Sequence, residues 1–191
     1  HDVWLDPLTR GSALHDVYAA YLRKVRDEGR RPSMPDEPWL LAHARSLLDD
    51  LHDEMPAPND EVLARETRDF LADVSLFLEA EVADTSREAV GLEVSFGRPI
   101  GEEDEAIASE EPAVITLAPS VTMRFAGRID RVDQVGPSTF EVLDYKTGGY
   151  FRDDWKGVFK GGARLQHALY GLAVVVKHVV HHAALANRDQ G

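Results

Sequence analysis

The stretch Gly127-Arg128-Ile129-Asp130-Arg131-Val132-Asp133, followed by Asp144-Tyr145-Lys146-Thr147-Gly148, predicts the centre of the fold. Apolar and polar residues alternate roughly over 121–135 and over 139–145, and β-branched and aromatic residues are enriched in both runs. Because a Gly-Pro-Ser turn at 136–138 separates the runs, they predict an antiparallel hairpin. On its second strand, Asp144 and Lys146 are two residues apart and are expected to point to the same face.

Asp144 and Lys146 would thus set a carboxylate beside an ammonium, with Asp130 on the paired strand. An exposed ion pair of this kind often has little consequence. A site for a divalent metal and a phosphodiester would explain why these three groups occur together. Hard Mg²⁺ or Mn²⁺ takes oxygen ligands, and a lysine stabilises charge that develops on phosphate. Asp130, Asp144 and the backbone carbonyl of Tyr145 are the predicted metal ligands. Asp133 is a rival to Asp130, and strand parity puts these two on opposite faces.

Three more segments extend this pattern. Gly11-Ser-Ala-Leu-His15 lies on a predicted helix over 7–29, Glu93 lies on a predicted strand over 89–99, and Gln166-His-Ala-Leu-Tyr170 lies on a predicted helix over 163–181. Together with the two central motifs, these segments resemble the PD-(D/E)XK nucleases. The resemblance is greatest to the RecB-like branch found at the C-terminal ends of the RecB and AddB/AddA helicase–nuclease subunits.

The resemblance implies a set of site residues. His15 would be an additional metal ligand, and Glu93 would orient a water or help a second ion. Gln166 and Tyr170, on one helix face, would position the scissile strand and support Lys146. The catalytic residues that the resemblance implies are Glu93, Asp130, Asp144, Lys146, Gln166 and Tyr170.

The resemblance also implies the architecture. We expect an α/β restriction-endonuclease-like core, in which helices flank a mixed central β-sheet, with an N-terminal helical insertion. Residues 1–191 would form a single nuclease domain, with the insertion at 30–85 and the catalytic core at 89–180. Within the insertion, apolar periodicity predicts helices over 39–55 and 60–83. Because His1 and not Met begins the sequence, we expect a fragment of a longer chain.

Basic residues suggest where nucleic acid would bind. Arg128 and Arg131 flank Asp130 and are expected on the opposite strand face or at its edge. The Gly-bounded loop over 150–162 mixes aromatic residues with Arg152, Lys156 and Lys160, a composition that suits single-stranded nucleic acid, where bases stack and phosphates pair with cations. A loop that covers a hydrophobic edge would have the same composition.

The charge of the chain is unevenly distributed. The formal net charge is -13, which by itself argues against binding to phosphates. From residue 124 to the end, however, there are 10 Lys and Arg against 7 Asp and Glu, whereas residues 1–123 hold 11 against 27. The part of the chain that carries the central motifs is therefore the basic part.

The cysteine count is zero, so this segment contains neither disulfides nor thiolate metal sites. The four-Cys iron–sulfur cluster of some RecB-like nucleases therefore cannot form within it. The sequence shows no signal peptide and no apolar run of the roughly 20 residues that a membrane span needs. We therefore expect a cytoplasmic location and no membrane partner.

These observations favour a Mg²⁺- or Mn²⁺-dependent deoxyribonuclease, more an exonuclease than an endonuclease. It would act on single strands or duplex ends of DNA as the nuclease module of a recombination or repair enzyme with a helicase motor. One alternative is a DNA-binding scaffold of the same fold without catalysis. The other is an acidic helical protein-interaction domain in which Asp-x-Lys is incidental.

Overall fold

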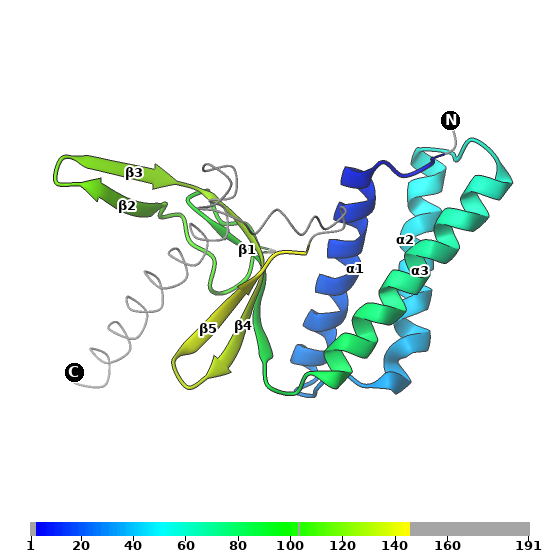
Figure 1. Ribbon diagram of the computed structural model, residues 1–191, viewed down its shortest axis with the longest axis horizontal. Coiled ribbons are helices and arrows are strands. Elements are labelled where there is room, and N and C mark those ends of the chain that lie inside the picture. The colour runs from blue at the N-terminus through cyan, green and yellow to red at the C-terminus, as the bar shows by residue number, and fades with distance from the viewer. Residues whose placement is uncertain (1–2, 103, 146–191) are drawn as a thin grey trace, which may run out of the picture. The chain divides into compact units, whose positions relative to one another are not determined.

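The computed structural model describes residues 3–102 and 104–145, and these separate into a helical unit and a strand unit. The described residues up to Arg87, together with Tyr145, form the helical unit, and those from Glu88 to Asp144 form the strand unit. The combination of helices and strands confirms the predicted α/β class (Figure 1). The predicted division into an insertion at 30–85 and a core at 89–180 stays a prediction.

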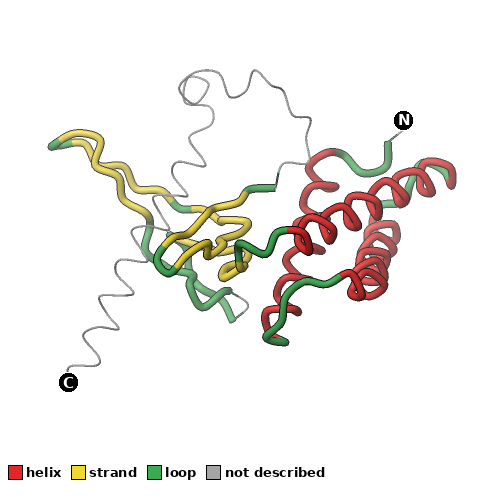
Figure 2. Tube along the Cα trace, turned by 60° about the horizontal axis from the view of Figure 1, so that its bottom comes forward, coloured by secondary structure: helices red, strands yellow, loops and turns green. Residues whose placement is uncertain are grey.

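Three long helices build the helical unit: α1 (Pro7–Asp27), α2 (Glu37–Glu54) and α3 (Asp60–Ala83), with a short 3₁₀ helix, η1 (Met34–Asp36), before α2. They pack side by side along their buried apolar faces (Figures 1 and 2). The side chains at their centre are fully buried, and each helix contributes some of them: Val17 and Tyr21 from α1, Leu40 and Ala44 from α2, and Phe70, Val74 and Leu78 from α3. Within the described ranges, no helix has the length and apolarity that a membrane crossing requires.

Capping residues fix the ends of these helices. The Asp6 side chain accepts hydrogen bonds from the first-turn amides of α1, and that of Asn59 accepts one from the Val62 amide at the start of α3. Gly29, at φ +64°, takes the left-handed conformation that follows the end of α1. The predicted helices over 7–29 and 60–83 are confirmed. The helix predicted over 39–55 begins earlier, at Glu37, because Pro38 fits the first turn, where its missing N–H costs no hydrogen bond.

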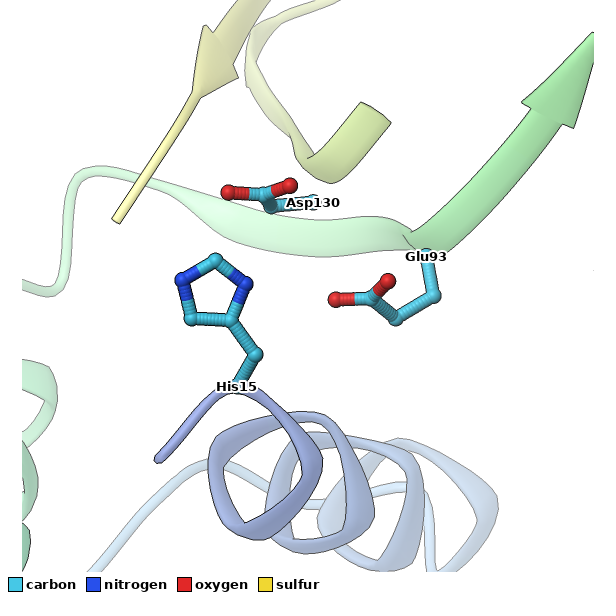
Figure 3. Close-up of side chains that lie close together, drawn as sticks. All are labelled: His15, Glu93 and Asp130. Carbon is cyan, nitrogen blue, oxygen red and sulfur yellow. The ribbon is translucent and has the colours of Figure 1, made fainter. Parts of the chain in front are cut away.

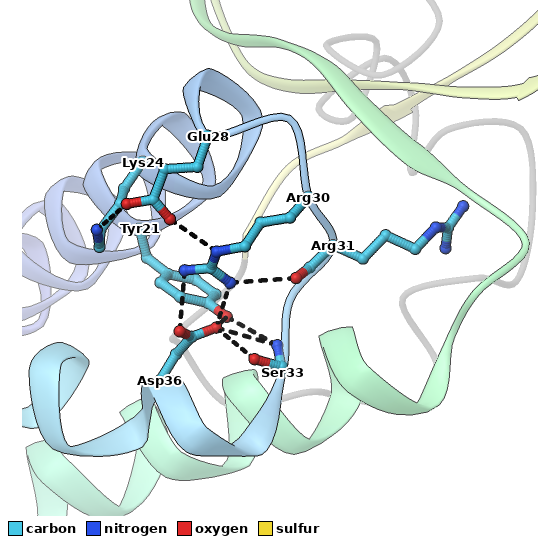
Figure 4. Close-up of polar contacts among 7 residues, drawn as sticks. All are labelled: Tyr21, Lys24, Glu28, Arg30, Arg31, Ser33 and Asp36. Atoms are coloured by element: carbon cyan, nitrogen blue, oxygen red, sulfur yellow. Dashed lines mark hydrogen bonds and ion pairs between the residues drawn. The ribbon is translucent and has the colours of Figure 1, made fainter.

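A partly buried polar network holds the end of α1 to the start of α2 (Figure 4). Asp36 accepts hydrogen bonds from Arg30 at 2.7 and 2.9 Å, from the Ser33 hydroxyl at 2.9 Å and from the Tyr21 hydroxyl at 2.9 Å. Burial alone would raise the pKa of Asp36, but these donors outweigh it and lower the pKa to about 2. The Asp36 carboxylate is therefore ionised at neutral pH and stabilises the junction between α1 and α2.

The depressed pKa of Asp36 predicts a loss of stability in acid. Since the folded state holds this proton less tightly than the unfolded state, the stabilisation is complete above about pH 4 and is lost as the pH falls toward 2. Replacing Asp36 by Asn should lower the free energy of unfolding at pH 7 by about 1–2 kcal/mol. It should also flatten the dependence of this free energy on pH between 4 and 2, as measured by urea denaturation. An unchanged acid slope in the variant would contradict the assignment.

The strand unit contains two antiparallel sheets. The first has the order β1-β4-β5, from β1 (Glu88–Phe96), β4 (Gly127–Gly136) and β5 (Thr139–Leu143). The second pairs β2 (Ala113–Ala118) with β3 (Val121–Phe125). Val94, Phe96, Ile129 and Val132 form the centre of the core, against which Phe125 and Val142 pack. The predicted hairpin is confirmed as the β4–β5 pair.

The strand predicted over 121–135 is in fact two strands. The chain changes partners at Ala126, so that β3 pairs with β2 while β4 pairs with β1 and β5. Gly97 permits the crossing: at φ +73° it comes so close to Ala126 that a Cβ on Gly97 would lie 2.6 Å from the Ala126 Cβ. The strand predicted over 139–145 also ends earlier, at Leu143.

Candidate metal centre

Two acidic residues, Glu93 and Asp130, occupy one row across the paired strands β1 and β4. In the β1–β4 pairing, Leu92 is opposite Arg131 and Val94 is opposite Ile129, so Glu93 and Asp130 are at matching positions. The last β4–β5 pair joins Arg131 to Leu143, and Asp144 follows Leu143 beyond the end of β5. Opposed residues of an antiparallel sheet project from the same face. The β1–β4 register therefore brings together two of the three carboxylates that the sequence predicted, and the role of Asp144 stays a prediction.

The side chains of Glu93 and Asp130 lie close together (Figure 3). Each offers a carboxylate oxygen, and these two oxygens lie within 4.8 Å of one another. Both residues are partly buried. The backbone of Glu93 is at φ +53°, a left-handed conformation that is uncommon for a residue other than glycine and costs of order 1–3 kcal/mol.

Arg128 supplies positive charge to this row. Its Nε lies 2.8 Å from Glu93 Oε2, and its side chain is 54% exposed whereas that of Glu93 is 10% exposed. The sequence analysis expected Arg128 on the opposite face from Asp130 or at its edge, but two residues of separation on a strand give both the same face. Arg128 thus offsets the negative charge of Glu93.

Arg131 corrects a second expectation. It was predicted to contact DNA, but its side chain is only 1% exposed and forms an ion pair with Asp133, which is fully buried. These two residues share the face of Ile129, on the other side of β4 from Asp130. The buried pair has a structural role, and this location favours Asp130 over its rival Asp133 as a metal ligand.

Tyr145 lies two residues after the end of β5 and belongs to the helical unit. Its ring makes edge contacts with three aromatic rings, at centroid distances of 5.4 Å from His15, 5.2 Å from Tyr18 and 6.2 Å from Phe77. Burial, reinforced by the charge of Asp73, raises the pKa of the Tyr18 hydroxyl. The sequence analysis assigned a role only to the backbone carbonyl of Tyr145 and missed this anchoring role of its ring.

The Tyr145 carbonyl oxygen lies 3.1 Å from His15 Nε2. His15 is half-buried on α1, where Figure 3 draws it, and Gly11 lies one turn before it. Two neighbouring ligands of an octahedral ion with bonds of about 2.1 Å lie about 3 Å apart. The distance therefore suits either a hydrogen bond between these groups or joint coordination of one cation.

The donor chemistry fits the predicted metal. Glu93 and Asp130 offer carboxylate oxygens, the ligand type that Mg²⁺ and Mn²⁺ prefer. Like charges set opposite one another across a sheet destabilise it, and a divalent cation would offset the repulsion between the Glu93 and Asp130 carboxylates. Thiolate ligands are absent from the sequence, which disfavours soft metals.

Several predicted site residues lie outside the described residues. They are Lys146, Gln166 and Tyr170 of the proposed catalytic set and Arg152, Lys156 and Lys160 of the proposed DNA contacts. Their assignments stay predictions.

Comparisons with known proteins identify the family. A family model described as the PD-(D/E)XK nuclease superfamily matches residues 2–186, nearly the whole chain. Neither a search of curated proteins nor a search of solved structures gave a match. The chain therefore belongs to the PD-(D/E)XK nuclease superfamily and has its restriction-endonuclease-like α/β fold.

Proposed function

We propose that this protein is a Mg²⁺- or Mn²⁺-dependent deoxyribonuclease. The observation that carries the proposal is that the carboxylate oxygens of Glu93 and Asp130 lie within 4.8 Å of each other, at matching positions of β1 and β4. Membership of a nuclease superfamily supports DNA as the substrate and a divalent ion as the cofactor. A bound ion would act as a Lewis acid toward the phosphate and lower the pKa of a coordinated water.

The residues of the chain have separate tasks in this proposal. The proposed metal ligands, which would hold the ion, are Asp130, Asp144, His15 and the carbonyl of Tyr145, and Glu93 would orient a metal-bound water or help a second ion. Lys146 donates hydrogen bonds to the phosphate and stabilises the negative charge that builds up as the phosphodiester breaks. The two residues predicted to position the scissile strand are Gln166 and Tyr170.

Exposed cations would hold the rest of the DNA. Arg128 is half exposed beside Glu93, where it is able to reach a phosphate at the edge of the site. The predicted loop residues Arg152, Lys156 and Lys160 complete the set. Arg131 is left out of it because its side chain is buried.

The resemblance to the RecB-like branch supports a finer proposal. The protein would act as an exonuclease on single strands or duplex ends, beside a helicase motor that feeds it DNA during recombination or repair. We propose a cytoplasmic location, which suits such a complex.

Cleavage of end-labelled single- and double-stranded DNA tests the proposed function. The wild-type protein should cut DNA with Mn²⁺ or Mg²⁺ and not with EDTA, and the product ladder gives the polarity. Replacing Lys146 by Ala should lower the cleavage rate roughly 10²–10³-fold, because it removes a group that acts on the transition state. The same variant should bind Mn²⁺ as the wild type does in calorimetry.

Two outcomes would point to the alternatives. Mn²⁺ binding without cleavage of any substrate would favour a scaffold of the same fold or a nuclease that needs its motor. The absence of both binding and cleavage would leave the acidic interaction domain as the better description and would refute the metal centre.

A further inference from the structure

The helical unit has a surface groove that the proposed nuclease chemistry does not use. It lies between α1 and α2, has a volume of about 420 Å³ and is lined by residues from both helices. Leu8, Leu47 and Leu51 are its large apolar lining residues, and its acidic lining residues, here called the acidic rim, are Asp16, Asp50 and Glu54, all exposed. The described residues that line the groove include no lysine or arginine.

The apolar part of the groove is exposed to solvent. Leu8 is 79% exposed in the first turn of α1, while Leu47 and Leu51 are half-buried, one turn apart on α2. A leucine buried by a partner gains about 1.5–3 kcal/mol relative to one left in water. A partner that covered these three leucines would therefore gain binding free energy, because the helical unit itself leaves them exposed or half-buried.

The helices that frame the groove are held in place on one side by the N-terminal segment. The indole Nε1 of Trp4 donates a hydrogen bond to the Met55 carbonyl just after α2, and the Trp4 and Leu5 amides donate to the Glu66 carboxylate on α3. Asp6 then caps α1, two residues before Leu8. A groove between fixed helices loses little conformational entropy when it binds a partner.

The charge of the rim determines what kind of partner fits. Phosphates would be repelled by Asp16, Asp50 and Glu54, so this is not a surface for DNA. All three side chains are exposed, so the groove is an open channel and not the enclosed pocket that buries most of a small ligand. From Leu8 to Asp16, α1 rises about 12 Å, which matches about two turns of a docked helix.

We propose that this groove binds a basic amphipathic helix of a partner protein. Apolar side chains of that helix pack on Leu8, Leu47 and Leu51, and its lysines or arginines face the acidic rim. This is the helix-in-groove mode of recognition, in which anchors at helical spacing supply the affinity and charged flanks select the partner. The proposal is independent of the nuclease activity.

The test uses the full chain and a labelled 16-residue helical peptide with leucines on one face and lysines on the other. Fluorescence anisotropy at about 0.15 M salt, a concentration that screens non-specific attraction, should show saturable binding. A twin peptide with glutamate in place of lysine should not bind. Replacing Leu8 by Ser should weaken the binding of the lysine peptide about tenfold.

Charge reversal on α2 provides a matched control. The double replacement Asp50→Lys and Glu54→Lys should weaken binding by about tenfold or more, because both side chains lie at the rim. The double replacement Asp49→Lys and Asp53→Lys makes the same change of net charge on the same helix, at exposed positions that do not line the groove, and should alter binding less than about twofold. Circular dichroism confirms that each variant is folded.

Three results would overturn the proposal. The first is equal weakening by the two charge reversals, which would mean attraction to the acidic helical unit as a whole. The second is equal binding of the lysine and glutamate peptides. The third is the absence of saturable binding by the wild-type protein.

Discussion

Replacing Asp130 by Ala is expected to abolish Mn²⁺ binding in calorimetry and to lower DNA cleavage roughly 10³-fold or more, while the protein stays folded. Asp130 lies opposite Glu93 in the β1–β4 pairing, and the two carboxylate oxygens lie within 4.8 Å of one another. The replacement removes one carboxylate ligand of the proposed metal centre. It also relieves repulsion between like charges, so the free energy of unfolding should stay the same or rise slightly in the absence of metal.

Asp133 provides the control for this experiment. It lies three residues further along the same strand, on the opposite face. Because Asp133→Ala destabilises the fold, binding by this variant is compared at a temperature where circular dichroism shows it to be folded. If Asp133→Ala lost Mn²⁺ binding while Asp130→Ala kept it, the ligand assignment would be reversed.

The largest effect on stability is expected at the buried ion pair. Replacing Asp133 by Ala should lower the free energy of unfolding by about 3–5 kcal/mol, because it leaves the Arg131 guanidinium buried without this carboxylate. A domain of this size has only about 5–15 kcal/mol of stability, so the variant would be marginal at 37 °C. Urea denaturation at 15 °C and at 25 °C provides the measurement.

A double variant separates the charge effect from a loss of packing. Arg131→Met with Asp133→Leu removes both charges and keeps apolar volume on this face of β4, so it should be more stable than Asp133→Ala alone. A loss below about 1 kcal/mol in Asp133→Ala would mean that solvent reaches the pair, contrary to its burial.

Local signals in the sequence were sufficient to predict several elements. The helix over 60–83 has an apolar face at helical spacing and an Asn59 cap, and α3 has these bounds. The β4–β5 hairpin follows from two alternating runs around Gly136-Pro137-Ser138. The proximity of Glu93 and Asp130 was expected from the resemblance to the PD-(D/E)XK nucleases, whereas strand parity alone only separates Asp130 from Asp133.

Other features depend on tertiary contacts that no local pattern encodes. The change of partner at Ala126 requires the close approach of Gly97, which lies 29 residues earlier in the sequence. The strand before Asp144 ends at Leu143, and Tyr145 packs on aromatic rings of α1 and α3, although alternation alone would continue the strand. The sequence pattern also does not predict the burial of Arg131, because a charged residue in an alternating strand usually lies on the solvent side.

Glu93 shows a conflict between stability and chemistry. Its φ of +53° suits glycine, and at such a position a residue with a Cβ is strained. A glycine there would relax the backbone, but it would also delete the carboxylate that faces Asp130 and pairs with Arg128. The chain thus retains a strained glutamate where glycine would fit without strain, as happens when a side chain is needed for its reactivity. Selection for thermostability would therefore favour glycine at position 93, and the resulting protein would have a higher melting temperature but would lack part of its metal centre.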